Sequence, residues 1–213
     1  MFRRLHIVKP KKILAERGFS LVELLVSISV LVLVMAVMMA GHNAFNSAVL
    51  LRSQAYDIAL ETRQVQLRAV SVIGGSVASD FRQQHGVFFR EASPFFAGRK
   101  YQIFRDGVAG TAGKVDSGEE FGRQGIVDSR FYISEIRTKD QSGTEAVIAG
   151  GISVMFERPN FDAHFYDSDG NALSDMVAVF IDLRVNGSAG LSGLENVRTI
   201  EITRSGQITV LGA

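Results

Sequence analysis

The sequence predicts an α+β fold in which one long N-terminal helix packs on an antiparallel β-sheet domain. An uninterrupted apolar run, followed by a segment with apolar residues every three or four positions, predicts the helix. Short runs in the remainder of the chain, in which apolar residues alternate with polar ones, predict the sheet. These patterns divide the chain into residues 1–18, 19–41, 42–75 and 76–213.

The first 18 residues form a basic leader. They contain one acidic residue, Glu16, and six basic ones: Arg3, Arg4, Lys9, Lys11, Lys12 and Arg17. The whole chain has 23 basic and 22 acidic residues, so 17 basic and 21 acidic residues remain after the leader and the net charge falls from +1 to −4. The alkaline pI therefore reflects the leader and does not indicate a nucleic-acid-binding surface. Because the chain has no cysteine, disulfides, thiolate metal sites and thiol catalysis are excluded.

The run from Phe19 to Gly41 predicts a transmembrane helix. Its 23 residues contain Glu23 as the only ionisable side chain, and roughly 20 helical residues cross a bilayer core. A secretory signal would have a shorter apolar region, of about 7 to 15 residues, before a cleavage site of small residues. A carboxylate at bilayer depth costs about 3 kcal/mol, so Glu23 is predicted to have a partner and a function.

The order Gly18-Phe19-Ser20-Leu21-Val22-Glu23 resembles the class III signal of type IV pilins and of the pseudopilins of type II secretion systems. The resemblance implies that a prepilin peptidase cuts between Gly18 and Phe19, and that Phe19 is then N-methylated. It also implies an assembly role for Glu23, whose carboxylate would neutralise the N-terminal ammonium of a neighbouring subunit in the apolar filament core. The alternative is a plain signal anchor, which leaves Glu23 without a role.

The same resemblance implies a pilin-like fold and a structural role as a minor pseudopilin or minor type IV pilin, without enzymatic activity or a cofactor. Ala40 stands where many major pilins have proline, which favours a minor subunit. The implied partners are the prepilin peptidase, other pilin or pseudopilin subunits through the N-terminal helix, the inner-membrane assembly platform, and membrane lipid before assembly. The implied location is the bacterial inner membrane, with a cytoplasmic N-terminus and the globular domain on the outer side.

The soluble part is most similar to the H-type minor pseudopilins. The similarity lies in the stretch from Ala59 to Arg82, in Gly86-Val87-Phe88-Phe89 and in Ser205-Gly206-Gln207-Ile208. Some pilus members of this family are implicated in DNA binding through a basic C-terminal segment, which makes Arg198 and Arg204 the candidate DNA-binding residues here. A DNA-binding competence-type pilin and a single-pass membrane-anchored binding protein are the two alternative functions.

The helix is predicted to continue beyond the apolar run. Apolar or small residues recur at helical spacing and predict one buried face: Ile58, Thr62, Val65, Ala69 and Val72. Proline is absent from Ile13 to Ser93, and Gly74-Gly75 is a stop signal, so we expect one helix over about residues 19–73.

Strands are predicted at residues 86–89, 100–104, 131–136, 146–156 and 177–185, with a closing hairpin at residues 197–203 and 207–211. Residues 177–185 alternate so that Val177, Val179 and Ile181 share a fully apolar face. The glycine-rich segment from Arg105 to Gly125 is predicted to be a long exposed loop.

The sequence contains one weak candidate for a metal site, Asp167-Ser168-Asp169-Gly170-Asn171, which resembles part of a calcium loop. It has no distal glutamate, so we interpret it as a turn. The histidines, at positions 6, 42, 85 and 164, lack metal-ligand spacing. Neither a nucleophile elbow nor a phosphate loop occurs, so we expect no enzyme and no bound metal.

Overall fold

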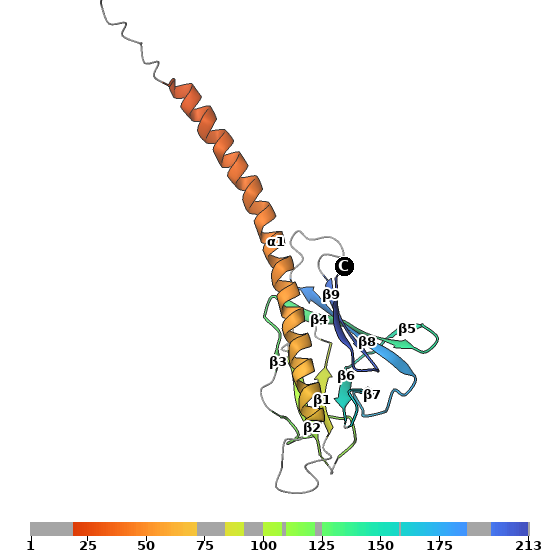
Figure 1. The fold of residues 1–213 in the computed structure, drawn as a ribbon. Helices are drawn as coiled ribbons and strands as arrows, with labels where there is room; N and C mark the ends of the chain where they lie inside the picture. Colours follow the sequence, from red (N-terminus) through yellow and green to blue (C-terminus); the bar gives the residue numbers. More distant parts are fainter. Residues whose placement is uncertain are drawn as a thin grey trace, which may run out of the picture. The chain divides into compact units, whose positions relative to one another are not determined.

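The computed structural model describes residues 19–71, 84–91, 100–107, 110–121, 125–157, 159–186 and 197–212. Within these residues the chain forms one helix, α1 (Leu21–Val70), and ten strands, β1 to β10, which confirms the α+β class (Figure 1). The chain divides into two compact units, Met1–Asn43 and Ala44–Ala213. All buried core side chains of the described residues belong to the second unit.

The prediction of one continuous helix is confirmed over the 50 residues of α1. Its last turn contains Arg68, and the Ser71 N–H donates a backbone hydrogen bond to the Leu67 carbonyl (2.8 Å). The predicted stop signal, Gly74-Gly75, lies outside the described residues.

The second half of α1 buries the face that the periodicity predicted. Its fully or almost fully buried side chains are Leu51, Ala55, Ile58, Thr62, Val65 and Ala69. The Thr62 hydroxyl donates to the Ile58 carbonyl (2.8 Å), so this polar group is satisfied inside the core. Val72 lies outside the described residues.

Two antiparallel five-stranded sheets complete the domain. The first has the order β3-β2-β1-β6-β7, formed by Gly125–Ile126, Lys100–Asp106, Gln84–Phe89, Ile152–Phe156 and Ala163–Asp167. The second has the order β10-β9-β8-β4-β5, formed by Ile208–Leu211, Val197–Thr203, Met176–Val185, Phe131–Asp140 and Glu145–Val147. One hydrophobic core joins residues of both sheets and of the second half of α1.

The predicted strands agree with the structure except at residues 146–156. That segment forms two strands, β5 and β6, which belong to different sheets. Gly150 and Gly151, with φ of 91° and 137°, separate them, and residues with side chains rarely adopt such values. β7 was not predicted, and β4 extends four residues further than expected, with a register irregularity between Ile133 and Glu135.

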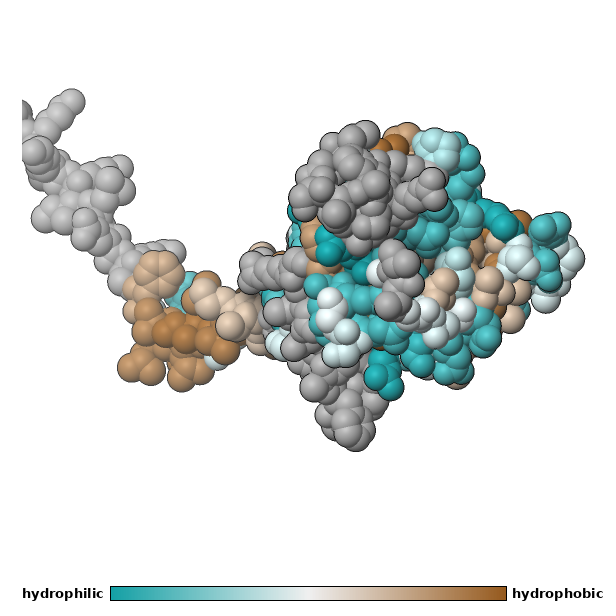
Figure 2. All heavy atoms as spheres, turned by 90° about the horizontal axis from the view of Figure 1, so that it is seen from below, coloured by the Kyte–Doolittle hydropathy of each residue, from teal (hydrophilic) through white to brown (hydrophobic). Residues whose placement is uncertain are grey.

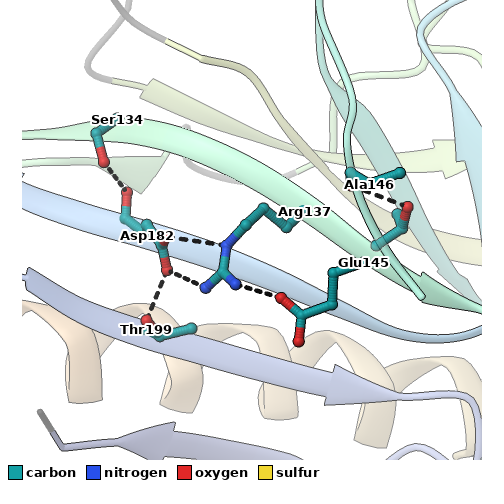
Figure 3. Close-up of polar contacts among 7 residues, drawn as sticks. Ser134, Arg137, Glu145, Ala146, Asp182 and Thr199 are labelled. Carbon is teal, nitrogen blue, oxygen red and sulfur yellow. Dashed lines mark hydrogen bonds and ion pairs between the residues drawn. The ribbon is translucent and has the colours of Figure 1, made fainter. Parts of the chain in front are cut away.

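The predicted alternation in β8 is confirmed for its apolar face, but the opposite face is also buried. Phe180 and Asp182 point away from the core and are nevertheless at most 7 % exposed. Figure 3 shows the reason: the Arg137 guanidinium donates to Asp182 through Nε (3.2 Å), and the Thr199 hydroxyl donates to the same carboxylate (2.6 Å). These side chains tie β4, β8 and β9 together.

The prediction of a long exposed loop from Arg105 to Gly125 is wrong in part. Phe121 donates its N–H to the Ile103 carbonyl (3.0 Å), so the segment folds back along β2. Gly113 is buried, and a Cβ at this position would lie 2.2 Å from the Tyr166 ring. The segment therefore packs against the outer face of the first sheet, where Phe104 and Met155 are fully buried.

Asp106 holds this segment and leads to a prediction about pH. Its side chain is 8 % exposed, and Oδ2 accepts the Gly113 N–H (2.8 Å). Burial raises the Asp106 pKa; the Gly113 N–H partly opposes this, and the charges of Glu119 and Asp116 reinforce it. The folded state therefore binds this proton more tightly than the unfolded state, and stability is lost as pH rises through the folded-state pKa.

We expect Asp106→Asn to raise the melting temperature at pH 7, because the amide oxygen still accepts the Gly113 N–H without carrying a charge. The gain should shrink to zero at about pH 3, below the ordinary pKa of aspartate. Thermal unfolding of the detergent-solubilised chain between pH 3 and pH 8 measures this difference, with exposed Asp175→Asn as the control. A gain that does not change with pH would contradict the prediction.

Candidate functional site

The N-terminal part of α1 is the candidate functional segment. Leu21–Met39 is long and apolar enough to cross a membrane by length and composition, and no other helix in the described part of the chain meets this criterion. None of its side chains is buried against other described residues. In Figure 2 this segment is predominantly brown, whereas the visible face of the domain is mainly teal and white.

Ser20 determines where the helix begins. Its hydroxyl oxygen accepts the N–H of Glu23 (3.2 Å), which is the N-cap interaction of a Ser-x-x-Glu capping box. Glu23 therefore lies in the first turn, where the partial positive charge of the helix end favours a carboxylate. The sequence prediction missed this role of Ser20, although the Ser-x-x-Glu pattern was available to reveal it.

Glu23 is the unusual polar group of the segment. The hydroxyls of Ser27 and Ser29 donate to the carbonyls of Glu23 and Leu25 (2.7 and 2.9 Å), so the helix itself satisfies them. No side chain or N–H of the described residues donates a hydrogen bond to the Glu23 carboxylate, and it forms no ion pair with them. The carboxylate is thus the polar group in this segment that still lacks a partner within the chain.

The predicted processing residues are placed only in part. Phe19 is exposed and precedes the N-cap, whereas Gly18 lies outside the described residues. Cleavage between them and methylation of Phe19 therefore stay predictions.

The two candidate DNA-binding residues lie at opposite ends of β9. Arg198 is half-buried, and its guanidinium donates to the Val197 carbonyl (2.9 Å). Arg204 lies in the turn after β9, where its guanidinium donates to the Ser174 carbonyl. The structure does not bring them together, and DNA binding through them stays a prediction.

The residues of the weak calcium pattern form a turn, as predicted. Oδ1 of Asp167 accepts the N–H groups of Asp169 and Asn171 (2.9 and 2.8 Å). These hydrogen bonds lower the Asp167 pKa, the largest contribution coming from the Asn171 side chain. Among the described residues, no group of three or more His, Asp or Glu side chains could hold a metal ion.

Comparison with known proteins identifies the N-terminal segment. The profile of the prokaryotic N-terminal methylation motif matches residues 14–39, which include Gly18, Phe19 and Glu23. No curated protein and no solved structure matches the chain significantly. The chain thus carries a prokaryotic N-terminal methylation motif, which supports the pilin-type signal inferred from these residues and membrane anchoring by the apolar helix.

Proposed function

We propose that the chain is a minor pseudopilin or minor type IV pilin, a structural subunit that a prepilin peptidase processes and that assembles into a secretion pseudopilus or a pilus. The observation that carries the proposal is the methylation motif at residues 14–39, which overlaps a membrane-length apolar helix. The α+β domain that follows is consistent with a pilin-like fold. Within this class we favour the H-type minor pseudopilins, on the residue patterns at 59–82, 86–89 and 205–208.

Processing creates the charge that the filament must neutralise. Hydrolysis of the Gly18–Phe19 peptide bond releases the basic leader and leaves an α-ammonium on Phe19, which then accepts a methyl group. This cation enters the same apolar environment as the unpartnered Glu23 carboxylate. An ion pair between the ammonium of one subunit and Glu23 of its neighbour neutralises both groups, and buried charges are tolerated when they are paired.

Ser20 supports this arrangement by fixing the start of the helix. Because its hydroxyl holds the Glu23 N–H, Phe19 stays just outside the helix and Glu23 stays in the first turn. The two charges therefore lie at defined heights along the helix axis, about one turn apart. Neighbouring subunits whose helices are offset by about one turn can pair them.

The proposed location follows from the charge of the leader. Its six basic residues hold the N-terminus in the cytoplasm, so the single apolar helix directs the domain to the outer side of the inner membrane. The proposed partners are the prepilin peptidase, the assembly platform and other pilin or pseudopilin subunits.

Co-expression with a prepilin peptidase tests the proposal. We expect intact-mass analysis to find a product that begins at Phe19 and carries one additional methyl group. Gly18→Asp should keep Met1 and the whole leader, because it changes the residue after which the peptidase cuts. If Met1 is retained in the unmodified chain while the same cells process a control prepilin, the membrane-anchored binding protein becomes the better explanation.

A further inference from the structure

The second half of α1 carries an exposed apolar stripe on the side opposite the core. Four large side chains are each between 48 and 59 % exposed: Val49, Tyr56, Leu60 and Leu67. At 3.6 residues per turn they lie within about 20° of one line along the helix. The buried face, centred on Ile58 and Thr62, lies on the other side. We call these four side chains the α1 ridge.

The α1 ridge has oppositely charged sides. Arg52 lies on one side, with its guanidinium 5.6 Å from the centre of the Tyr56 ring. Asp57 lies on the other side, where Glu61 follows it and accepts a hydrogen bond from the Tyr101 hydroxyl. Arg52 and Asp57 are exposed, and neither forms an ion pair with another described residue.

We propose that the α1 ridge is a docking surface for the α1 ridge of a second copy of this chain, in parallel orientation. When two parallel helices face each other, the left side of one meets the right side of the other, as at the flanking positions of coiled coils. Arg52 of each copy then lies opposite Asp57 of the other, five residues further along. In the antiparallel arrangement Arg52 would meet Arg52, which is unfavourable. The charges therefore select the parallel pair.

The membrane supplies the concentration that so small a surface needs. Four partly exposed side chains bury far less area than a stable protein complex requires, roughly 1,200 Å² or more in total. Two chains inserted in one membrane are already parallel and share a small volume, which raises their effective concentration. The inference thus rests on the proposed function in one respect, that the N-terminal segment anchors both copies in the same orientation.

Cross-linking in membranes tests the docking surface, because the natural chain has no cysteine. Differently tagged full-length Arg52→Cys and Asp57→Cys chains are co-expressed and treated with a short thiol-to-thiol reagent. We expect on the order of fivefold more product between the two variants than within either one, because only opposite sides of the α1 ridge meet. Equal yields, or no product, would overturn the parallel pair.

A second pair of changes tests the ridge itself. Leu60→Lys, added to both cysteine variants, should reduce the mixed product about fivefold or more, because it places charge in the apolar contact. Val147→Lys on β5 is the matched control, because Val147 is 57 % and Leu60 is 59 % exposed. An unchanged yield with Leu60→Lys, or an equal loss with Val147→Lys, would contradict docking through the α1 ridge.

The same samples separate this inference from the proposed function. Intact mass reports whether each chain begins at Phe19, independently of cross-linking. Processed chains without mixed product overturn the docking surface alone. Unprocessed chains that still give the mixed product overturn the proposed function and leave the docking surface standing.

Discussion

Glu23→Val is expected to remain in the membrane but to disappear almost completely from the filament fraction. Removal of the carboxylate lowers the cost of insertion by about 3 kcal/mol, so anchoring should be unaffected or stronger. In the filament, however, the change leaves the ammonium of a neighbouring Phe19 without its partner. An unpaired buried charge costs about 3 to 5 kcal/mol, so we expect at least about a 100-fold lower tendency to be incorporated.

Comparison of sheared filaments with the membrane fraction measures this effect in cells that contain the remaining assembly proteins. Glu23→Gln should be impaired as well, because the amide keeps hydrogen-bonding capacity but cannot neutralise a cation. Ser29→Val is the matched control in the same segment, because its hydroxyl is already bonded to the Leu25 carbonyl. Normal incorporation of Glu23→Val would show that the carboxylate has no pairing role.

Gly206→Ala is expected to destabilise the domain by about 4 kcal/mol or more. Gly206 has φ of +78°, and a Cβ at this position would lie 1.8 Å from the Phe161 carbonyl oxygen and 2.5 Å from Nε2 of Gln66. Gln66 is 4 % exposed, and its amide donates to the carbonyls of Phe161 and Gly206 (2.9 and 2.8 Å). A methyl group here must displace this amide, which joins α1 to the β9–β10 turn.

The expected loss combines two costs. A left-handed backbone conformation costs a residue with a side chain about 1 kcal/mol or more, and each buried hydrogen-bonding group left unpaired costs about 1 to 3 kcal/mol. Thermal unfolding should show a decrease of about 10 °C in melting temperature.

Gly118→Ala isolates the backbone cost, because Gly118 has φ of +94° and a Cβ there would meet no atom within 4 Å. It should lower the melting temperature by only a few degrees. Equal effects of the two substitutions would show that the contact between Gly206, Phe161 and Gln66 contributes little to stability.

Local patterns were sufficient where one element decides its own structure. The spacing of Ile58, Thr62, Val65 and Ala69 predicted the buried helix face, because a helix presents every third or fourth residue to the same side. The hairpin was predicted for a similar reason, and Ile200 and Ile202 pair with Val210 and Ile208 as expected. In the candidate site, the position of Glu23 in an apolar run was visible directly.

Local patterns failed where distant residues decide. Residues 146–156 look like one strand, but two glycines allow the chain to leave one sheet and join the other. Asp182 looks like a solvent-facing position, but Arg137 from β4 and Thr199 from β9 cover it. Gln66 carries no apolar signal and is buried because its amide meets two carbonyls from other parts of the chain.

The sequence by itself determined the membrane-length helix, the pilin-type signal with Glu23 and the α+β class, because each depends on residues that are close together in the chain. Only the tertiary structure decided which sheet each strand joins, how the segment after β2 packs on the first sheet, and which face of α1 stays exposed. The physical reason is that burial and hydrogen-bond pairing depend on distant partners. Opposite charges on either side of the α1 ridge acquire meaning only when the core has claimed the other face of the helix.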